Sequence, residues 1–186
     1  MNNSIIVAIT GASGSIYAQK FINDVLAYSN YSINLIFSET AKKVWKYELA
    51  SQLPTPSERI TIFSNDDFFA SPASGSSGFL YMVVIPCSMG TLGRIAQGVS
   101  IDLIGRAADV ILKERQKLIL VPRELPYNLI HLKNMTQITE AGGIIIPASP
   151  SFYSHPTTIE QLIETVTDRI LQLVNIQKPI FRWSEK

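Results

Sequence analysis

Short runs of consecutive apolar residues alternate along this chain with longer stretches whose apolar residues recur at helical spacing. The short runs predict strands at Ile5–Thr10, Ser32–Ser38, Arg59–Phe63, Leu80–Ile85, Lys117–Val121 and Gly143–Ile146. The longer stretches predict helices at Ser15–Ala27, Lys42–Leu53, Leu92–Gln97, Ser100–Arg115, Tyr127–Glu140 and Thr158–Val174. Strands that are apolar throughout are typical of a parallel sheet covered on both faces. The pattern therefore predicts a three-layer, doubly wound α/β fold.

Length and composition narrow the class of protein. The chain has 186 residues, 46% of them apolar, and a net charge of +1, which suits one compact domain over residues 1–186. So balanced a charge gives no reason to expect nucleic acid or a membrane surface as a partner. The single cysteine, Cys87, excludes an intrachain disulfide. No apolar run reaches the roughly 20 residues of a membrane span, and the first residues do not resemble a signal peptide, so we expect a cytoplasmic protein.

Polar and glycine-rich segments follow the predicted strands. In doubly wound folds, ligands bind outside the carboxyl ends of the strands, where the strand order reverses. The segments that meet this requirement are Gly11–Ser15, Ser38-Glu39, Ser74–Gly78, Cys87–Thr91 and Arg123-Glu124. We therefore expect the functional site among them.

The glycine-rich loop after the first strand does not fit the common phosphate-binding patterns. The dinucleotide fingerprint would need glycine where Ser13 and Ile16 stand, and the P-loop lysine is missing. Free backbone N–H groups, serine hydroxyls and a helix N-terminus still favour an anion or a flavin, with a simple tight turn as the alternative. After the second strand, Ser38 is the better ligand candidate, since Glu39 suits the first turn of the next helix.

Basic residues occur in two further segments. In the Ser100–Arg115 helix, Arg106 and Lys113 lie away from the apolar stripe, about 10 Å apart along the axis. They could bind one anion only if a ligand or a neighbouring chain met that side, and a solvated face with Asp–Arg pairs is the favoured alternative. Arg123 could clamp a phosphate and Glu124 carry a proton, but a loop ion pair between them explains the residues equally well.

Other chemically capable residues carry weaker signals. His131 and His155 have no metal-ligand spacing and form no recognisable triad, so we expect structural roles for both. Cys87 follows a buried strand and more plausibly packs than reacts. Tyr153 in a proline-rich loop and Arg169 on the last helix are unremarkable by themselves.

Seven ordered motifs together resemble one family. They are TGASGSIY at 10–17, PASGSSG at 72–78, PCSMGTL at 86–92, RAADVILKER at 106–115, VPRELPY at 121–127, HLKNM at 131–135 and PASPSFY at 147–153. In this order they resemble the UbiX-type flavin prenyltransferases, relatives of the flavin-containing cysteine decarboxylases. The resemblance covers nearly the whole chain and implies a Rossmann or flavodoxin-like fold.

The resemblance also implies an activity. Members of this family transfer a dimethylallyl group from dimethylallyl phosphate to N5 and C6 of reduced FMN, without a metal. The prenylated FMN serves decarboxylases of the UbiD type. Members typically assemble as homododecamers with active sites at subunit contacts, which would explain how separated basic residues meet one substrate.

The resemblance assigns roles to individual positions. Residues that match the FMN contacts are Gly11, Ala12, Ser13, Ser38, Ser88, Met89, Gly90, Thr91 and Arg123. Residues that match the surroundings of the prenyl phosphate are Glu48, Arg106, Lys113, Tyr153 and Arg169, and Trp183 matches an aromatic residue in a C-terminal tail, residues 176–186, that closes the active site. The expected catalytic residues are Ser13, Glu48, Lys113 and Glu124, with Glu124 moving the proton.

One position departs from the family and two other functions compete with transfer. Phe68 stands where some relatives have tryptophan, which puts the rate or the choice between phosphate and diphosphate donors in doubt. The first alternative is an FMN-dependent cysteine decarboxylase, but PAS continues as Gly75-Ser76-Ser77 here, and the early helices carry no histidine. The second is a protein that only binds FMN, which would need no prenyl-phosphate residues.

Overall fold

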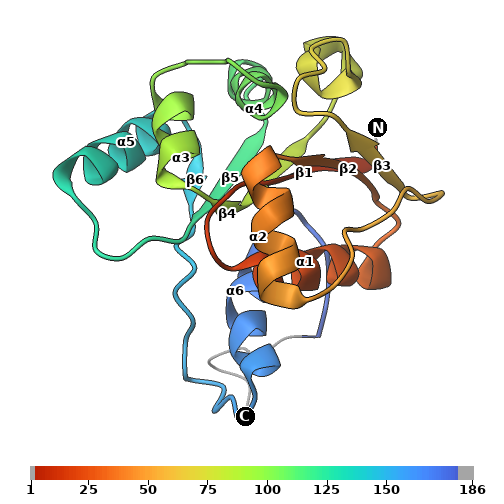
Figure 1. Cartoon of the computed structure of the whole chain (residues 1–186), viewed down its shortest axis with the longest axis vertical. Coiled ribbons are helices and arrows are strands. Elements are labelled where there is room, and N and C mark those ends of the chain that lie inside the picture. Colours follow the sequence, from red (N-terminus) through yellow and green to blue (C-terminus); the bar gives the residue numbers. More distant parts are fainter. Residues whose placement is uncertain (1–2, 180–186) are drawn as a thin grey trace.

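The computed structural model describes residues 3–179 and contains one six-stranded, fully parallel sheet (Figure 1). Its strands are β1 (Ser4–Ile9), β2 (Ser32–Phe37), β3 (Ile60–Phe63), β4 (Tyr81–Cys87), β5 (Lys117–Pro122) and β6 (Ile144–Ile145). They lie in the order β3-β2-β1-β4-β5-β6. The chain therefore grows outward from β1 in one direction and then from β4 in the other, which puts the switch point between these two strands.

Helices cover both faces of the sheet, as the sequence predicts. The helices are α1 (Ser15–Tyr28), α2 (Glu39–Leu49), α3 (Met89–Ala96), α4 (Leu103–Lys113), α5 (Leu129–Glu140) and α6 (Ile159–Leu173). One apolar core joins the sheet to α1, α2 and α6, and a second joins it to α3, α4 and α5. The three-layer, doubly wound fold is confirmed, and α4 and α6 lie on opposite sides of the sheet (Figure 1).

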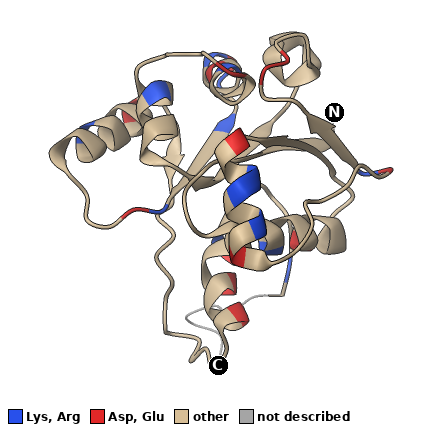
Figure 2. Cartoon of the chain, in the orientation of Figure 1, with Lys and Arg blue, Asp and Glu red and all other residues tan. Residues whose placement is uncertain are grey.

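Buried apolar side chains fix the two helical layers. Phe21 and Val25 of α1 are fully buried, and Trp45 of α2 meets Phe37 of β2 edge to face with the ring centroids 5.7 Å apart. On the other face, the stripe of Ile104, Ala107, Ala108 and Ile111 on α4 is buried, as its spacing predicts. The charged residues lie mainly in helices and loops, and the strands are almost free of them (Figure 2).

Three helices, α2, α3 and α4, have a boundary that differs from the sequence prediction by three residues or more. Helix α2 begins at Glu39, because Ser38 caps it, and ends at Leu49, where Ala50 turns left-handed, instead of running to Leu53. Helix α3 begins at Met89, three residues early, with Ser88 as its cap. Helix α4 is shorter, since Asp102 caps its start.

Two further comparisons concern the loops and the chain end. The segment between β3 and β4 contains two 3₁₀ turns, Ser71–Ala73 and Gly75–Ser77. Trp183 and most of the expected C-terminal tail lie outside the described residues. Within residues 3–179, none of the helices combines the length and apolarity needed to cross a membrane.

Candidate active site

The carboxyl ends of β1 and β4 meet at the switch point. Thr10, directly after β1, is buried, and its hydroxyl donates to the carbonyl of Pro86 at 2.8 Å. The same oxygen accepts the N–H of Ser88 at 2.7 Å. This pair of bonds holds the loops after β1 and β4 side by side, so that the N-termini of α1 and α3 lie at the edge of the sheet where doubly wound folds bind ligands.

The glycine-rich loop holds an anion of the protein itself. Gly14 is left-handed, with φ 110°, and its N–H lies 3.1 and 3.0 Å from the two carboxylate oxygens of Glu48 on α2. The N–H of Ser15 donates to Glu48 at 2.8 Å, and Ser13 contributes a side-chain hydrogen bond. The carboxylate of Glu48 therefore satisfies N–H groups that α1 would otherwise leave unpaired.

These contacts also set the charge state of Glu48. Partial burial by itself would raise the pKa of this carboxyl group. The hydrogen bonds from Ser13, Ser15 and Gly14 outweigh that effect and hold the pKa below its ordinary value. Glu48 is therefore ionised at neutral pH and lies against Ser13, which is expected both to contact FMN and to be catalytic.

Position 11 requires glycine because there is no room for a side chain. A Cβ atom there would lie 2.5 Å from a side-chain carbon of Thr40 at the start of α2. The loop thus passes close to α2, and its backbone stays open to a ligand.

Two serine hydroxyls expected to contact FMN also cap helices. Ser38 accepts the N–H of Ala41 at 3.1 Å, and Ser88 accepts the N–H of Thr91 at 3.3 Å. Met89, Gly90 and Thr91 therefore form the first turn of α3, where backbone N–H groups point out of the helix.

Arg123 joins the end of β5 to the same loop. Its Nε donates to the carbonyl oxygen of Ser13 at 3.2 Å. Burial raises the pKa of nearby Tyr17, and the charge of Arg123 opposes that rise. Glu124 is exposed, and its carboxylate accepts the N–H of Leu125 at 3.1 Å. The expected flavin contacts at positions 11–13, 38, 88–91 and 123 thus all lie at the carboxyl-end edge of the sheet.

The basic residues of α4 lie at the PASGSSG loop. Arg106 donates from Nε to the carbonyl of Ala73 at 3.2 Å and from Nη1 to Asp109 at 2.6 Å, so the predicted Asp–Arg pair is present. Lys113 pairs with Glu114. A Cβ atom at Gly75 would lie 2.9 Å from the Nζ of Lys113. Both cations therefore face the loop that precedes β4.

Tyr153 and Arg169 line a cavity of about 1060 Å³ beside α6. The guanidinium of Arg169 donates to Gln172 at 2.8 Å. Since α6 and α4 cover opposite faces of the sheet, one chain does not bring Arg169 together with Arg106 or Lys113. The structure thus gathers the expected residues in three groups, one at the switch point, one at the PASGSSG loop and one beside α6.

The remaining expected residues have mostly structural surroundings. His131 is part of the capping box at the start of α5, as its expected structural role requires. His155 lines the cavity beside α6.

Burial raises the pKa of the Cys87 thiol to about 12. Within residues 3–179, no group of three or more His, Cys, Asp or Glu is placed to hold a metal. Phe68 is half exposed, next to a fully exposed Phe69.

Sequence reasoning missed several residues around these groups. Arg94 donates to the hydroxyl of Thr91 at 3.2 Å, beside the first turn of α3. Glu164, Asp168 and Lys178 line the cavity with Tyr153 and Arg169. The i,i+4 spacing of Glu164 and Asp168 was one sign, and Lys178 lies in the tail at residues 176–186 that is expected to close the active site.

Comparison with known proteins decides the family. The flavoprotein family model matches residues 1–175. A curated flavin prenyltransferase UbiX of Methanocaldococcus jannaschii is 46% identical over 181 residues, covering 96% of this chain and 97% of the relative. The chain belongs to the flavoprotein family, among the UbiX flavin prenyltransferases.

Solved structures of UbiX proteins have the same fold. AnUbiX in complex with FMN and dimethylallyl pyrophosphate matches with a TM-score of 0.89 at 36% identity, covering 99% of this chain and 100% of that one. A dodecameric FMN-dependent UbiX-like decarboxylase from Escherichia coli O157:H7 matches with a TM-score of 0.90 at 34% identity, covering 98% and 100%. As a UbiX protein, this chain therefore shares its architecture with relatives over its whole length.

Proposed function

We propose that this chain is a flavin prenyltransferase that moves a dimethylallyl group from dimethylallyl phosphate to N5 and C6 of reduced FMN. The full-length match to a curated flavin prenyltransferase at 46% identity carries the proposal. The donors at the switch point support it, because backbone N–H groups, the hydroxyls of Ser13, Ser38 and Ser88, and the Arg123 guanidinium suit a phosphate and the polar edge of a flavin. Gly11, Ala12 and the first turn of α3 would complete that binding site.

Four side chains away from the switch point would stabilise the leaving phosphate. Breaking the allylic C–O bond leaves the electron pair, and thus negative charge, on the phosphate. Arg106, Lys113, Arg169 and Tyr153 can donate to it, and such positioned donors commonly lower a barrier by several kcal/mol. Reduced FMN supplies the electron-rich acceptor positions.

The carboxylates would act at the reacting edge. Closing the second bond at C6 releases a proton, for which exposed Glu124, or the retained phosphate, is the acceptor. Glu48, held ionised on the glycine-rich loop, would favour the positive charge that develops on the prenyl fragment.

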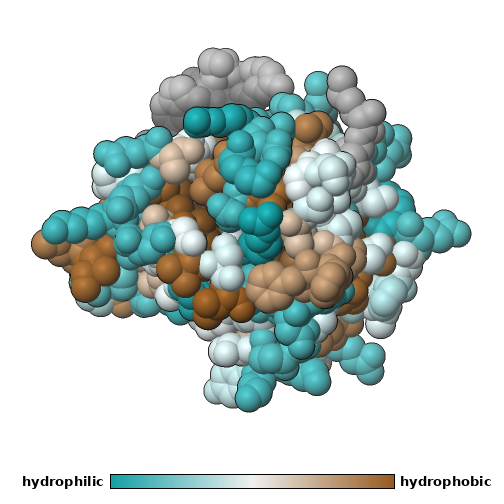
Figure 3. Space-filling model, turned by 90° about the horizontal axis from the view of Figure 1, so that it is seen from above, coloured by the Kyte–Doolittle hydropathy of each residue, from teal (hydrophilic) through white to brown (hydrophobic). Residues whose placement is uncertain are grey.

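We propose that copies of the chain complete each site. The cations on α4 and α6 lie on opposite faces of the sheet, and the E. coli relative is dodecameric. The segment around α5 exposes Leu125, Leu129, Ile130 and Leu132, and hydrophobic surface gathers at the α5 end of the molecule (Figure 3). A homododecamer would cover this surface and bring the two cation groups to one phosphate.

Three further expectations remain predictions. The product would serve a UbiD-type decarboxylase, the tail with Trp183 would close over the prenyl chain, and the protein would work in the cytoplasm.

The proposal is tested by mass spectrometry of the flavin after anaerobic incubation with reduced FMN and dimethylallyl phosphate or its diphosphate. We expect a flavin heavier by one prenyl unit. Unmodified FMN with an intact donor would refute transfer, and release of CO₂ from a peptidyl cysteine would then favour the decarboxylase alternative.

Glu124→Gln tests the proton role within the same assay. We expect turnover to fall roughly tenfold or more, with FMN still bound, because general acid–base catalysis commonly contributes 10² or more. Glu140→Gln, an exposed carboxylate at the end of α5, is the matched control. Equal turnover in both variants would remove Glu124 from the mechanism.

A further inference from the structure

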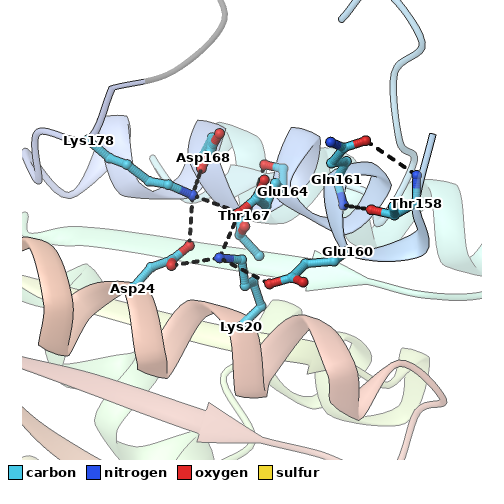
Figure 4. A network of polar contacts seen from close by, with 9 residues as sticks. All are labelled: Lys20, Asp24, Thr158, Glu160, Gln161, Glu164, Thr167, Asp168 and Lys178. Carbon is cyan, nitrogen blue, oxygen red and sulfur yellow. Dashed lines mark hydrogen bonds and ion pairs between the residues drawn. The ribbon is translucent and has the colours of Figure 1, made fainter. Parts of the chain in front are cut away.

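A cluster of six charged residues joins α1, α6 and the segment after α6 (Figure 4). The Nζ of Lys178 lies 2.9 Å from Asp168, 3.2 Å from Asp24 and 3.3 Å from Glu164. Lys20 joins from α1, 2.9 Å from Asp24 and 2.7 Å from Glu164. Lys20 also lies 3.9 Å from Glu160, so two ammonium groups face four carboxylates.

Lys178 is the most enclosed cation of the cluster. Its side chain is 8% exposed and that of its partner Asp24 is 5% exposed. Burial alone would lower the pKa of Lys178, but hydrogen bonds and charges from Asp168 and Asp24 outweigh it and raise the pKa. Burial raises the pKa of Asp168, and Lys178 opposes that rise. Lys178 is therefore charged at neutral pH, and its charge favours the ionised form of Asp168.

The cluster forms part of the wall of the cavity that contains Tyr153 and Arg169. Glu164, Asp168 and Lys178 all line that cavity, whereas Lys20 does not. On α6, Glu164 and Asp168 lie toward one side of the cavity-lining face and Arg169 toward the other. Two positive and two negative side chains thus share the wall, and without Lys178 the wall would be negative beside Arg169.

We propose that Lys178 is a positioning residue of the prenyl-phosphate subsite, neutralising Asp168 and Glu164 so that Arg169 and Tyr153 can accept an anionic donor. The inference rests on the proposed function, because it assumes that the donor phosphate reaches this cavity. An unpaired carboxylate in the wall would repel the phosphate through a partly screened medium. Lys178 acts through the charge of its neighbours and does not need to touch the substrate.

The alternative role, a purely structural clamp between α1 and α6, makes a different prediction. If Lys178 acts only as a clamp, removing any of its partners weakens the structure. If its role is electrostatic, removing Lys178 impairs donor binding, and removing Asp168 as well restores it. The pair Lys178 and Asp168 therefore separates the two roles in a double-mutant cycle.

The experiment measures the KM for dimethylallyl phosphate in Lys178→Met, Asp168→Asn and the double variant, with Lys178→Arg as the conservative rescue. We expect Lys178→Met to raise the KM roughly threefold to tenfold, less at high salt, with the FMN dissociation constant unchanged. Asp168→Asn should lower the KM, and the double variant should return it close to the wild-type value. Lys20→Met removes the second cation that pairs with Glu164, so it should raise the KM in the same direction as Lys178→Met.

Two results would overturn the inference while wild-type protein still prenylates FMN. One is an unchanged KM in Lys178→Met, and the other is a double variant as impaired as Lys178→Met alone, which would identify a clamp. If wild-type protein leaves the donor intact, the proposed function fails first and this inference fails with it.

Discussion

Glu48 stabilises the N-terminus of α1 and is at the same time a proposed catalytic residue. Its carboxylate accepts the N–H groups of Gly14 and Ser15, so the positive end of α1 is filled by the protein's own anion. A ligand at the glycine-rich loop therefore meets Ser13 and an ionised carboxylate rather than an empty anion site.

The lowered pKa of Glu48 predicts how stability depends on pH. Because the carboxyl group has a lower pKa in the folded protein than its ordinary value of 4.5, it stabilises the fold above that value and loses this contribution as the pH falls through the folded pKa. We expect Glu48→Gln to lower the Tm at pH 7, and the difference from wild type to shrink toward pH 3. A difference independent of pH, measured by calorimetry against Glu140→Gln, would contradict this role.

Cys87 illustrates the opposite case of a reactive group made inert. The thiol is fully buried at the end of β4, and burial raises its pKa to about 12. We expect no labelling by a disulfide reagent at pH 8 in the folded protein and one equivalent after unfolding in guanidinium. Rapid labelling of the native protein would contradict this prediction, because it would show that the reagent reaches Cys87 in the folded state.

The candidate site is formed more by residues at the starts of helices than by residues in helix interiors. Ser38 and Ser88 begin α2 and α3 at the carboxyl-end edge of the sheet, and Thr158 begins α6 in the same manner elsewhere. The apolar stripes that fix these helices were readable from spacing alone. The early start of α3 was not expected from its apolar residues, although Ser88 is a typical cap.

This arrangement predicts a separable effect of two cap mutations. Ser88→Ala and Thr158→Ala each remove a hydroxyl that accepts an N–H, so each should cost about 1 kcal/mol of unfolding free energy. Only Ser88→Ala should also weaken FMN binding, measured by fluorescence titration. Equal FMN affinity in both variants would confine Ser88 to its structural role.

For the whole molecule, the sequence predicted the three layers of the fold but not which residues far apart in the sequence contact each other. Apolar strands and the segments after them indicated a parallel sheet and the edge that carries the site. The contact of Glu48 with Gly14 crosses 34 positions, and that of Lys178 with Asp24 crosses 154. Such contacts depend on how helices pack across the sheet, which spacing within one helix does not encode.

The central claim is that prenyl transfer takes place in sites shared between copies, because Arg106 and Arg169 lie on opposite faces of one sheet. Co-expression of Arg106→Ala with Arg169→Ala tests it, with prenylated FMN measured by mass spectrometry. Each variant alone should be nearly inactive, while mixed oligomers should regain about a quarter of the wild-type activity, since random assembly leaves both arginines in about one site in four. No recovery in mixed oligomers, with active wild-type protein beside them, would contradict the shared site.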